Sequence, residues 1–267
     1  MTRPLITLTT DFGLHDPSVG SMKGVILSIH GDVTLVDLTH AIPPYAIASA
    51  SYVLGIASQY FPPGSIHLAV VDPGVGSPRR PLVCSAGGQQ YVGPDNGLFA
   101  AICRRNPSWQ SFEIAETRYC LKPPSMSPTF QGRDVFAPAA AWLARGTAPA
   151  AFGPRVTDLI DMESPDAGRA PRHGSSLQAG GIIWVDRFGN LISGIEFTPG
   201  MTEGVVSIGG KDVPLVTHYA EGPRDAPAAL VNSDGLVEIF VNRGDASRML
   251  GASIGTPITV ISRRRAT

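Results

Sequence analysis

The sequence predicts an α/β protein in two parts: an amino-terminal α/β sandwich-like domain with a mostly parallel sheet, and a carboxyl-terminal antiparallel β-barrel. Strand-like runs alternate with helical patterns in the first part, which is typical of a sheet wrapped by helices. A polar stretch rich in turn residues follows, and beyond it short β-like runs succeed one another with little helix. We therefore expect domains over residues 1–163 and 178–267, joined by a linker over 164–177.

Composition narrows the classes of protein and partner. The 267 residues carry a formal net charge of −1, which gives no electrostatic reason to expect nucleic acid or an anionic membrane as a partner. No apolar run is long enough to span a bilayer. The three cysteines, Cys84, Cys103 and Cys120, lack metal-type spacing. Their odd number, with no signal peptide, favours a reducing, cytoplasmic setting.

In the first domain, each element is predicted from periodicity and from the residues that interrupt it. Runs rich in β-branched residues predict strands, and apolar residues at helical spacing predict helices. The predicted order is strand 5–10, helix 19–30, strand 32–38, helix 47–59, strand 66–71, hairpin 81–85 with 90–92, helix 98–104 and an Ala-rich helix near 139–143, with Asp134 as its cap.

The second domain is predicted from a series of short apolar runs separated by turns. This spacing indicates a small antiparallel barrel or sandwich. The predicted strands cover residues 181–185, 191–197, 205–208, 213–217, 229–231, 236–241 and 257–261.

Three strands of the first domain are predicted to end at an aspartate: Asp11, Asp37 and Asp72. The carboxyl ends of parallel strands lie along one edge of a sheet, where open α/β sheets bind their ligands. These side chains are therefore expected to face one cleft. The alternative is that Asp is a common cap in strand-to-helix loops, which explains one aspartate better than three.

The residues around Asp72 make it the strongest of these candidates. Asp72-Pro73-Gly74 breaks a buried strand abruptly, and Gly74 and Gly76 permit backbone angles that other residues resist. Arg79 and Arg80 follow on a tether short enough to fold back and pair with the carboxylate. The alternative is a strand-terminating turn with a solvated aspartate.

Six short motifs together resemble the S-adenosyl-L-methionine hydroxide adenosyltransferases, relatives of the fluorinase and chlorinase enzymes. The resemblance covers nearly the whole chain, in order. Each motif is weak alone, but the set is specific. The motifs are Thr9–Gly13, Asp72–Gly76, Gly93–Gly97, Phe130–Asp134, Asp186–Asn190 and Val241–Gly244.

The resemblance implies cleavage of S-adenosyl-L-methionine to adenosine and L-methionine. A water-derived hydroxide would attack the ribose 5′ carbon, and methionine would leave as a neutral thioether. No metal or cofactor is implied, because the electrophile carries its own positive charge. The family resemblance also implies a homotrimer, with the site between the first domain of one subunit and the second domain of a neighbour.

The family places an Asp, an Arg and a His around the attacking water. The resemblance implies Asp72 for the first position and Arg79 for the second, where Arg79 would orient the carboxylate and stabilise developing hydroxide charge. Arg80 would be solvated. The third position differs, because the family's Phe-His-Gly-Arg-Asp reads Phe130-Gln131-Gly132-Arg133-Asp134 here. Gln131 can position a water through hydrogen bonds, but it cannot carry a proton.

The resemblance further implies substrate-binding residues in the first domain. Asp11 would accept hydrogen bonds from two ribose hydroxyls, Ser18 would contact the methionine end, and Tyr45 would pack on the sugar or adenine. Phe130 belongs to the same implied set, and Asn96 would support the site loop. The structural alternatives are a helix cap or turn at Asp11, a half-buried aromatic at Tyr45 and a turn at Asn96.

In the second domain, the resemblance implies that Asp186 pairs with the methionine ammonium and that Asn190 reads the adenine edge. Asn242 and Arg243 would meet the methionine carboxylate. The Asp186–Asn190 sequence is also that of a plausible β-turn, so spacing alone leaves both of its residues ambiguous.

Two further functions remain open. With Gln131 in place of His, the protein could bind S-adenosyl-L-methionine or adenosine with little turnover. Halide-dependent adenosyl transfer is disfavoured, because the halogenating relatives carry Tyr at the position of Asp72 and a carboxylate repels a halide. A metal site from Asp11, Asp37, Asp72 and His40 is not expected, because no compact His/Asp motif supports it.

Overall fold

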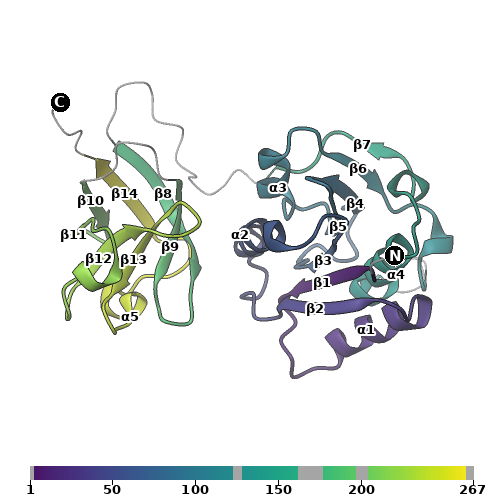
Figure 1. The fold of residues 1–267 in the computed structure, drawn as a ribbon, viewed down its shortest axis with the longest axis horizontal. Helices are drawn as coiled ribbons and strands as arrows, with labels where there is room; N and C mark the ends of the chain where they lie inside the picture. Colours follow the sequence, from purple (N-terminus) through teal and green to yellow (C-terminus); the bar gives the residue numbers. More distant parts are fainter. Residues whose placement is uncertain (1–2, 123–127, 162–176, 197–203, 263–267) are drawn as a thin grey trace. The chain divides into compact units, whose positions relative to one another are not determined.

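The computed structural model describes residues 3–122, 128–161, 177–196 and 204–262. Packing divides the chain into two compact units, Met1–Met162 and Glu163–Thr267 (Figure 1). Each unit has its own hydrophobic core. The predicted linker over 164–177 lies outside the described residues except for its last position.

The first unit is built on a seven-stranded sheet that is parallel on one side and antiparallel on the other. Its strands are β1 Leu5–Thr10, β2 Thr34–Thr39, β3 Ile66–Val70, β4 Pro81–Ala86, β5 Gln89–Pro94, β6 Gln110–Glu113 and β7 Arg155–Val156. In the order β2-β1-β3-β5-β4-β6-β7, the pairs up to β5 are parallel and those beyond it are antiparallel. The predicted α/β class and the predicted hairpin, β4 with β5, are confirmed.

Helices cover both faces of this sheet. They are α1 Ser18–Ile29, α2 Ile47–Ala57, α3 Ala100–Arg105 and α4 Ala137–Ala144, with short 3₁₀ turns η1 Ser58–Tyr60, η2 Thr117–Tyr119 and η4 Pro149–Ala151. α1 and α4 pack on the face that carries Ile6, Leu8 and Leu68, and this contact forms the main core. α2 and α3 pack against each other, away from α1 and α4 (Figure 1).

The segment before α4 differs from the expectation. Residues Gly132–Phe136 form a π-helix, η3, that continues directly into α4. Asp134 was expected to cap α4, but its buried carboxylate accepts two hydrogen bonds of 2.8 Å from the neighbouring Arg133. That prediction is wrong because η3 supplies the preceding turn, so α4 has no exposed amino-terminal amides for a cap to satisfy.

The second unit is an antiparallel, nearly closed barrel of seven strands. They are β8 Leu177–Val185, β9 Leu191–Glu196, β10 Gly204–Ile208, β11 Lys211–Pro214, β12 Pro227–Val231, β13 Leu236–Val241 and β14 Pro257–Ser262, with α5 Ala246–Leu250 and the 3₁₀ turn η5 Tyr219–Glu221 between them. The order is β11-β10-β14-β8-β9-β13-β12. Its ends meet where Leu215 pairs with Ala229 and Val216 donates a 2.8 Å hydrogen bond to the Ala229 carbonyl. The predicted barrel is confirmed.

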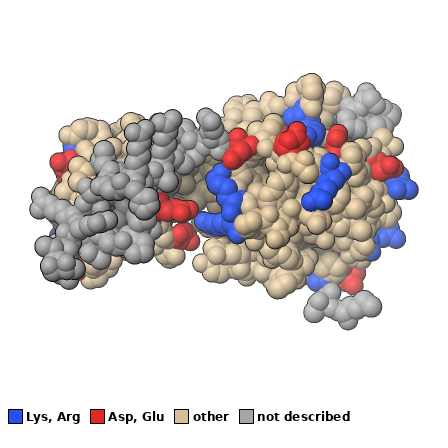
Figure 2. Space-filling model, turned by 90° about the horizontal axis from the view of Figure 1, so that it is seen from above, with Lys and Arg blue, Asp and Glu red and all other residues tan. Residues whose placement is uncertain are grey.

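Charged side chains are mixed on the face that Figure 2 shows, where Lys and Arg of the first unit lie among Asp and Glu. That face carries no continuous basic stripe of the kind that tracks a nucleic-acid backbone. Among the described residues, no helix combines the length and apolar character that crossing a membrane requires.

Candidate functional site

Two of the predicted aspartates lie at one edge of the first sheet. β1 and β3 are parallel neighbours, with Thr10 opposite Val70. Asp11 and Asp72 therefore both follow their strands at the carboxyl edge, where open α/β sheets bind ligands.

Asp37 does not belong to this edge. It lies inside β2 opposite Leu8, because β2 continues to Thr39. Its carboxylate accepts a 2.7 Å hydrogen bond from the Lys23 ammonium of α1. The prediction that three aspartates would share a cleft is therefore wrong for Asp37.

After β3 the chain turns sharply and returns Arg79 to the Asp72 carboxylate. The turn is held by the Val75 N–H, which donates to the Asp72 carbonyl at 3.3 Å, and Gly76 adopts a φ of +82° that favours glycine. Arg79 Nε donates to Asp72 Oδ1 at 2.9 Å, and Nη2 donates to Oδ2. The two side chains are 5% and 7% exposed, so this is a buried bidentate ion pair.

Gln131 completes the cluster from its position directly before η3. It is 5% exposed, and its Oε1 accepts a 2.6 Å hydrogen bond from Arg79 Nη2. The Arg79 guanidinium also lies 5.2 Å from the centre of the Phe136 ring. Arg79 Nη1 is buried and has no hydrogen-bond partner among the described residues. Buried donors are rarely left unpaired, so Nη1 indicates where a small polar ligand would bind.

Asn96 supports this cluster from the neighbouring loop. Its Nδ2 donates a 2.9 Å hydrogen bond to the carbonyl of Val71, the residue directly before Asp72. Its Oδ1 accepts from the Leu98 N–H at 3.3 Å. Asn96 therefore ties the 93–97 loop to the end of β3 and also forms the turn that the alternative reading expected.

Arg80 was expected to be solvated, and that expectation is wrong. Its Nε and Nη2 donate to Asp95 Oδ2 at 2.9 and 2.6 Å, and its Nη1 donates to Asp158 Oδ1 at 2.8 Å. The Asp158 and Asp95 carboxylates raise the pKa of Arg80. Asp95 follows β5, one strand beyond Asp72, so the two consecutive arginines reach carboxylates at neighbouring strand ends.

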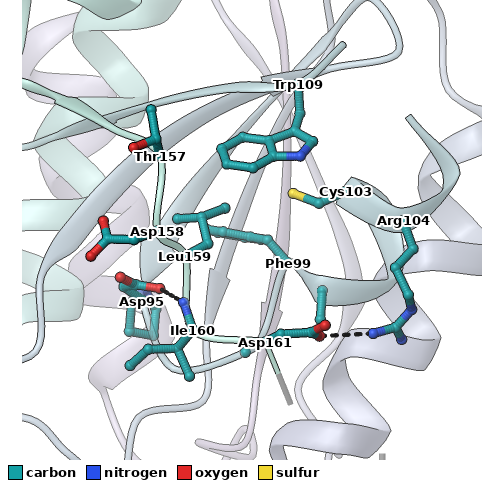
Figure 3. Close-up of a pocket in the computed structure, with 13 residues that line it drawn as sticks. Asp95, Phe99, Cys103, Arg104, Trp109, Thr157, Asp158, Leu159, Ile160 and Asp161 are labelled. Atoms are coloured by element: carbon teal, nitrogen blue, oxygen red, sulfur yellow. Dashed lines mark hydrogen bonds and ion pairs between the residues drawn. The ribbon is translucent and has the colours of Figure 1, made fainter. Parts of the chain in front are cut away.

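A pocket of about 300 Å³ lies beside this second ion pair, between α3 and residues 157–161 (Figure 3). Apolar side chains, among them Phe99, Trp109 and Leu159, form much of its wall. Its charged groups pair with one another or with Arg80, as Asp161 does with Arg104 at 2.9 Å. No residue of the predicted site lines it, so it is separate from the Asp72 cluster.

Asp11 contacts the predicted aromatic residue of the site. Its Oδ2 accepts a 3.0 Å hydrogen bond from the Tyr45 N–H, while Oδ1 accepts none from the described residues. Tyr45 has a φ of 67°, a strained conformation for a residue with a side chain. Its side chain is 71% exposed, so the half-buried alternative for Tyr45 is wrong. Ser18 opens α1 and is half-buried.

Phe130 and Gly132 form a tightly packed wall next to Gln131. The Phe130 ring meets the Phe12 ring edge-on, with centroids 6.0 Å apart. A Cβ at Gly132 would lie 3.2 Å from the Phe130 ring and 3.3 Å from Met22 Sδ. A larger residue at Gly132 would therefore force these neighbours to move.

The barrel residues form a turn whose polar groups bond one another. Asp186 Oδ1 accepts the N–H groups of Phe188 and Asn190, each at 2.8 Å, and Oδ2 accepts Asn190 Nδ2 at 3.0 Å. The β-turn alternative is therefore correct as geometry. A carboxylate has about four acceptor positions, so Asp186 retains capacity for one further donor. The Phe188 side chain is 75% exposed.

The second barrel motif lies against the first. The Ser247 N–H donates to the Gly189 carbonyl at 3.0 Å, and a Cβ at Gly189 would collide with the Asp245 carboxylate. Arg243, which precedes Asp245, is exposed and has a φ of 60°. Asn242 Nδ2 donates to the Gly222 carbonyl at 3.4 Å. The predicted barrel residues thus gather at adjoining turns.

The barrel also holds a buried carboxyl that the sequence did not single out. Glu238 of β13 is 4% exposed, and burial raises its pKa. Tyr219 donates a 2.7 Å hydrogen bond to Glu238 Oε1, and burial together with this carboxyl raises the pKa of Tyr219. The sequence predicted only a buried strand here, because β13 is otherwise apolar, and so the buried carboxyl of Glu238 was missed.

Comparisons with known proteins agree with these features. The profile described as SAM hydroxide adenosyltransferase N-terminal domain matches residues 6–153, and the corresponding C-terminal domain profile matches residues 180–259. The chain is 41% identical to the (R)-S-adenosyl-L-methionine hydrolase of Thermus thermophilus, over 97% of this chain and all of the relative. A fluorinase from Actinoplanes sp. is 24% identical over 96% of this chain and 97% of its own length.

A solved structure has the same fold. An uncharacterized conserved protein from Thermotoga maritima superposes with a TM-score of 0.85 and 31% identity, over 96% of this chain and 99% of the other. With this coverage, the match includes residues of both units.

Proposed function

This chain belongs to the SAM hydroxide adenosyltransferase family, and from that premise we propose that it hydrolyses S-adenosyl-L-methionine to adenosine and L-methionine. The 41% identity to a relative named a hydrolase supports hydrolysis, whereas the fluorinase match, at 24% identity, is more distant. The observation that carries the proposal is the buried Asp72–Arg79–Gln131 cluster with its unpartnered Arg79 Nη1.

In the proposed reaction a water molecule binds to an acceptor position of the Asp72 carboxylate that Arg79 leaves open, since Nε and Nη2 take one position on each oxygen. Asp72 accepts a hydrogen bond from the water and takes its proton as the oxygen attacks the ribose 5′ carbon. Arg79 stabilises the negative charge that develops on that oxygen. Gln131 fixes the guanidinium through Nη2 and has no proton of its own to exchange near neutral pH.

The leaving group removes the need for a resident cofactor. The sulfonium sulfur accepts the electron pair of the breaking carbon–sulfur bond and departs as a neutral thioether, so no acid must protonate it. Line-up of oxygen, carbon and sulfur is the main requirement on the protein, together with a site that excludes bulk water.

We assign substrate contacts to the residues that surround the cluster. Asp11 Oδ1 is available to a ribose hydroxyl, and the exposed Tyr45 ring offers a surface for the sugar or adenine. Phe130 supplies an apolar wall, and Ser18 contacts the methionine end.

In the barrel, we assign the methionine ammonium to the remaining acceptor of Asp186. Asn190 is assigned to the adenine edge, although its Nδ2 already donates to Asp186, so its Oδ1 is the atom available to a ligand. Asn242 and Arg243 are assigned to the methionine carboxylate.

We further propose a homotrimer in which the first unit of one subunit meets the second unit of a neighbour. Exposed aromatic residues in both residue sets, Tyr45 at 71% and Phe188 at 75%, support burial on assembly. Sedimentation equilibrium would test this, with an expected mass of about three chains of 28.1 kDa.

We also propose that the protein acts in the reducing cytoplasm, which the free thiols of Cys84, Cys103 and Cys120 support.

Incubation of the purified protein with S-adenosyl-L-methionine tests the function directly. Because the Thermus relative is named for the (R) form, both sulfonium epimers are supplied separately, with and without chloride, and products are resolved by chromatography. Equimolar adenosine and methionine are expected, independent of chloride.

Two outcomes would replace this proposal. Tight binding without products would identify a binding protein, the reading that Gln131 favours. A 5′-halogenated adenosine would identify halide transfer, which a buried carboxylate at Asp72 opposes.

A further inference from the structure

The buried side chain of His40 is bonded to the turn that carries Asp11. His40 is 6% exposed and its Nδ1 lies 2.8 Å from Thr10 Oγ1. The same Thr10 oxygen accepts the Phe12 N–H at 3.2 Å, and the His40 carbonyl accepts the Gly13 N–H at 2.8 Å. His40 therefore contacts both ends of the Asp11–Phe12–Gly13 turn.

The Asp37 carboxylate assigns the tautomer of His40. Nε2 lies 3.1 Å from Asp37 Oδ1, an oxygen that can only accept, so the ring proton is placed on Nε2, although this contact does not have hydrogen-bond geometry. Nδ1 then accepts from the Thr10 hydroxyl at 2.8 Å. Asp37 is in turn held by the Lys23 ammonium at 2.7 Å. The result is a series of polar contacts from α1 through β2 to the end of β1.

A second link joins the same two segments. The Tyr45 N–H donates to Asp11 Oδ2 at 3.0 Å, and the left-handed backbone of Tyr45 directs this N–H to the carboxylate. Residues 40–45 thus bond the Asp11 turn twice, at the His40 carbonyl and the Tyr45 amide. The turn follows the last residue of β1, so without these bonds its conformation would depend on local preference alone.

We propose that His40 is a positioning residue, which holds the Asp11 turn so that the carboxylate meets a vicinal diol such as that of ribose. This rests on the proposed function for the identity of the ligand. It assigns to His40 no contact with substrate and no proton transfer, and it explains the position of Asp37, which the sequence placed at the site and the structure places behind it.

The sheet contains a matched control for this proposal. His67 of β3 makes the same bond, since its Nδ1 lies 2.8 Å from Thr7 Oγ1, and it is fully buried. Its ring stacks on Tyr91 with centroids 5.0 Å apart. It makes no hydrogen bond with the described residues 10–13, so substitution there removes an equivalent bond without touching the Asp11 turn.

The test compares Thr10→Val and His40→Leu with Thr7→Val and His67→Leu in the full chain. Loss of the His40–Thr10 hydrogen bond, accompanied in Thr10→Val by loss of the bond from the Phe12 N–H, should raise KM for S-adenosyl-L-methionine and the Kd of adenosine about tenfold, with kcat within about threefold. His40→Asn retains an acceptor near the Nδ1 position and should return both constants to within about threefold of the parent. The Thr7 and His67 variants should leave both constants unchanged.

Amide hydrogen exchange separates this proposal from the proposed function. The amides of Gly13 and Tyr45 should exchange about tenfold faster in His40→Leu than in His67→Leu, whether or not the protein turns over substrate. Equal exchange in both variants would overturn the positioning role. An inactive parent that binds no adenosine, with the exchange difference intact, would reject the function and leave the role of His40 standing. Equal loss of affinity in the His40 and His67 variants would show that His40 acts only through the stability of the core, and would contradict the positioning role.

Discussion

Two consecutive arginines, Arg79 and Arg80, form ion pairs with aspartates at neighbouring strand ends of the first unit. The two pairs differ in whether every N–H group of the arginine side chain that is buried has a hydrogen-bond acceptor. In the pair formed by Arg80, Asp95 Oδ2 accepts two N–H groups and Oδ1 accepts the Ile160 N–H at 3.0 Å. The remaining donors of Arg80 reach Asp158. This pair, which we call the closed pair because both carboxylate oxygens of Asp95 are hydrogen-bonded within the protein, links the end of β5 to residues 158–160.

The pair formed by Arg79 is equally well made but incomplete. Asp72 takes two of its N–H groups and Gln131 takes another, yet Nη1 stays without a partner among the described residues. A buried carboxylate that accepts two N–H groups from one arginine is therefore a poor marker of a site, because both pairs have one. The informative difference is an unsatisfied donor in a buried cluster.

The largest expected effect lies at the incomplete pair. Asp72→Asn removes the base but keeps the shape, so kcat should fall by a factor of about 10² to 10⁴ while the Kd of adenosine changes by less than about threefold. Initial rates and calorimetry measure these two quantities. Asp95→Asn is the matched control and should keep kcat within about threefold. Full activity in Asp72→Asn would remove this carboxylate from the mechanism.

Substitution in the Arg80–Asp95 pair should lower the stability of the fold rather than kcat. Asp95→Ala leaves a partly buried Arg80 and the Ile160 N–H without their acceptor, which should lower the free energy of unfolding by about 3 kcal/mol. Urea unfolding followed by circular dichroism measures the loss. Asp158→Asn, at the exposed end of the same pair, is the control and should leave the urea midpoint nearly unchanged. If Asp95→Ala lost kcat in proportion to Asp72→Asn, the two pairs would not differ in role.

Acid will destabilise the fold, and this effect must be separated from the chemistry of the incomplete pair. Burial lowers the pKa of His67 from about 6.5 to about 4. Between these two pKa values, His67 is protonated in the unfolded chain but neutral in the folded one. Proton binding therefore favours the unfolded chain, and the free energy of unfolding decreases as pH falls from 6.5 to 4. At pH 5 the free energy of unfolding should be about 2 kcal/mol lower than at pH 8.

Urea midpoints across this pH range test the assignment. In His67→Leu the dependence should flatten, even though the variant is less stable overall. An unchanged slope in that variant would show that other groups cause the acid lability.

The smallest expected effect concerns the third member of the cluster. Gln131→His can still accept the Arg79 N–H, so kcat at pH 8 should remain within about threefold of the parent. Because an imidazole with an ordinary pKa near 6.5 titrates in this range, the variant should acquire a new acid limb that the parent lacks. Rate profiles from pH 5.5 to 8.5 measure it, with Gln131→Leu as the variant that loses the acceptor. Identical profiles for His and Gln would place position 131 outside the hydrogen-bond network of the reaction.

Periodicity predicted most of the fold, because the first β-strands and helices each carry their own local signal. β1 and α1 lie within one or two residues of their predicted bounds. The π-helix η3 was not predictable, since a single inserted residue leaves helical spacing almost unchanged. Strands β6 and β7 were missed because they are short and lie at the end of the sheet, where pairing of β6 to β4 and of β7 to β6 holds them rather than an apolar pattern of their own.

The candidate site divides in the same way. Asp72 and Arg79 were predictable because the turn between them is local and rich in glycine. The partner of Arg80 was not, since Asp158 is 78 residues away and only tertiary structure brings it near. Asp37 misled for a physical reason: strand propensity in Val36 and Leu38 carries β2 past it.

The join between Leu215 and Ala229 has a consequence for how the second unit can associate. In this nearly closed barrel, one bridge brings β11 and β12 together, so among the described residues each end strand is partly covered by the other. A strand added here from another chain would have to displace that contact, which makes this join a poor place for cross-chain β-pairing.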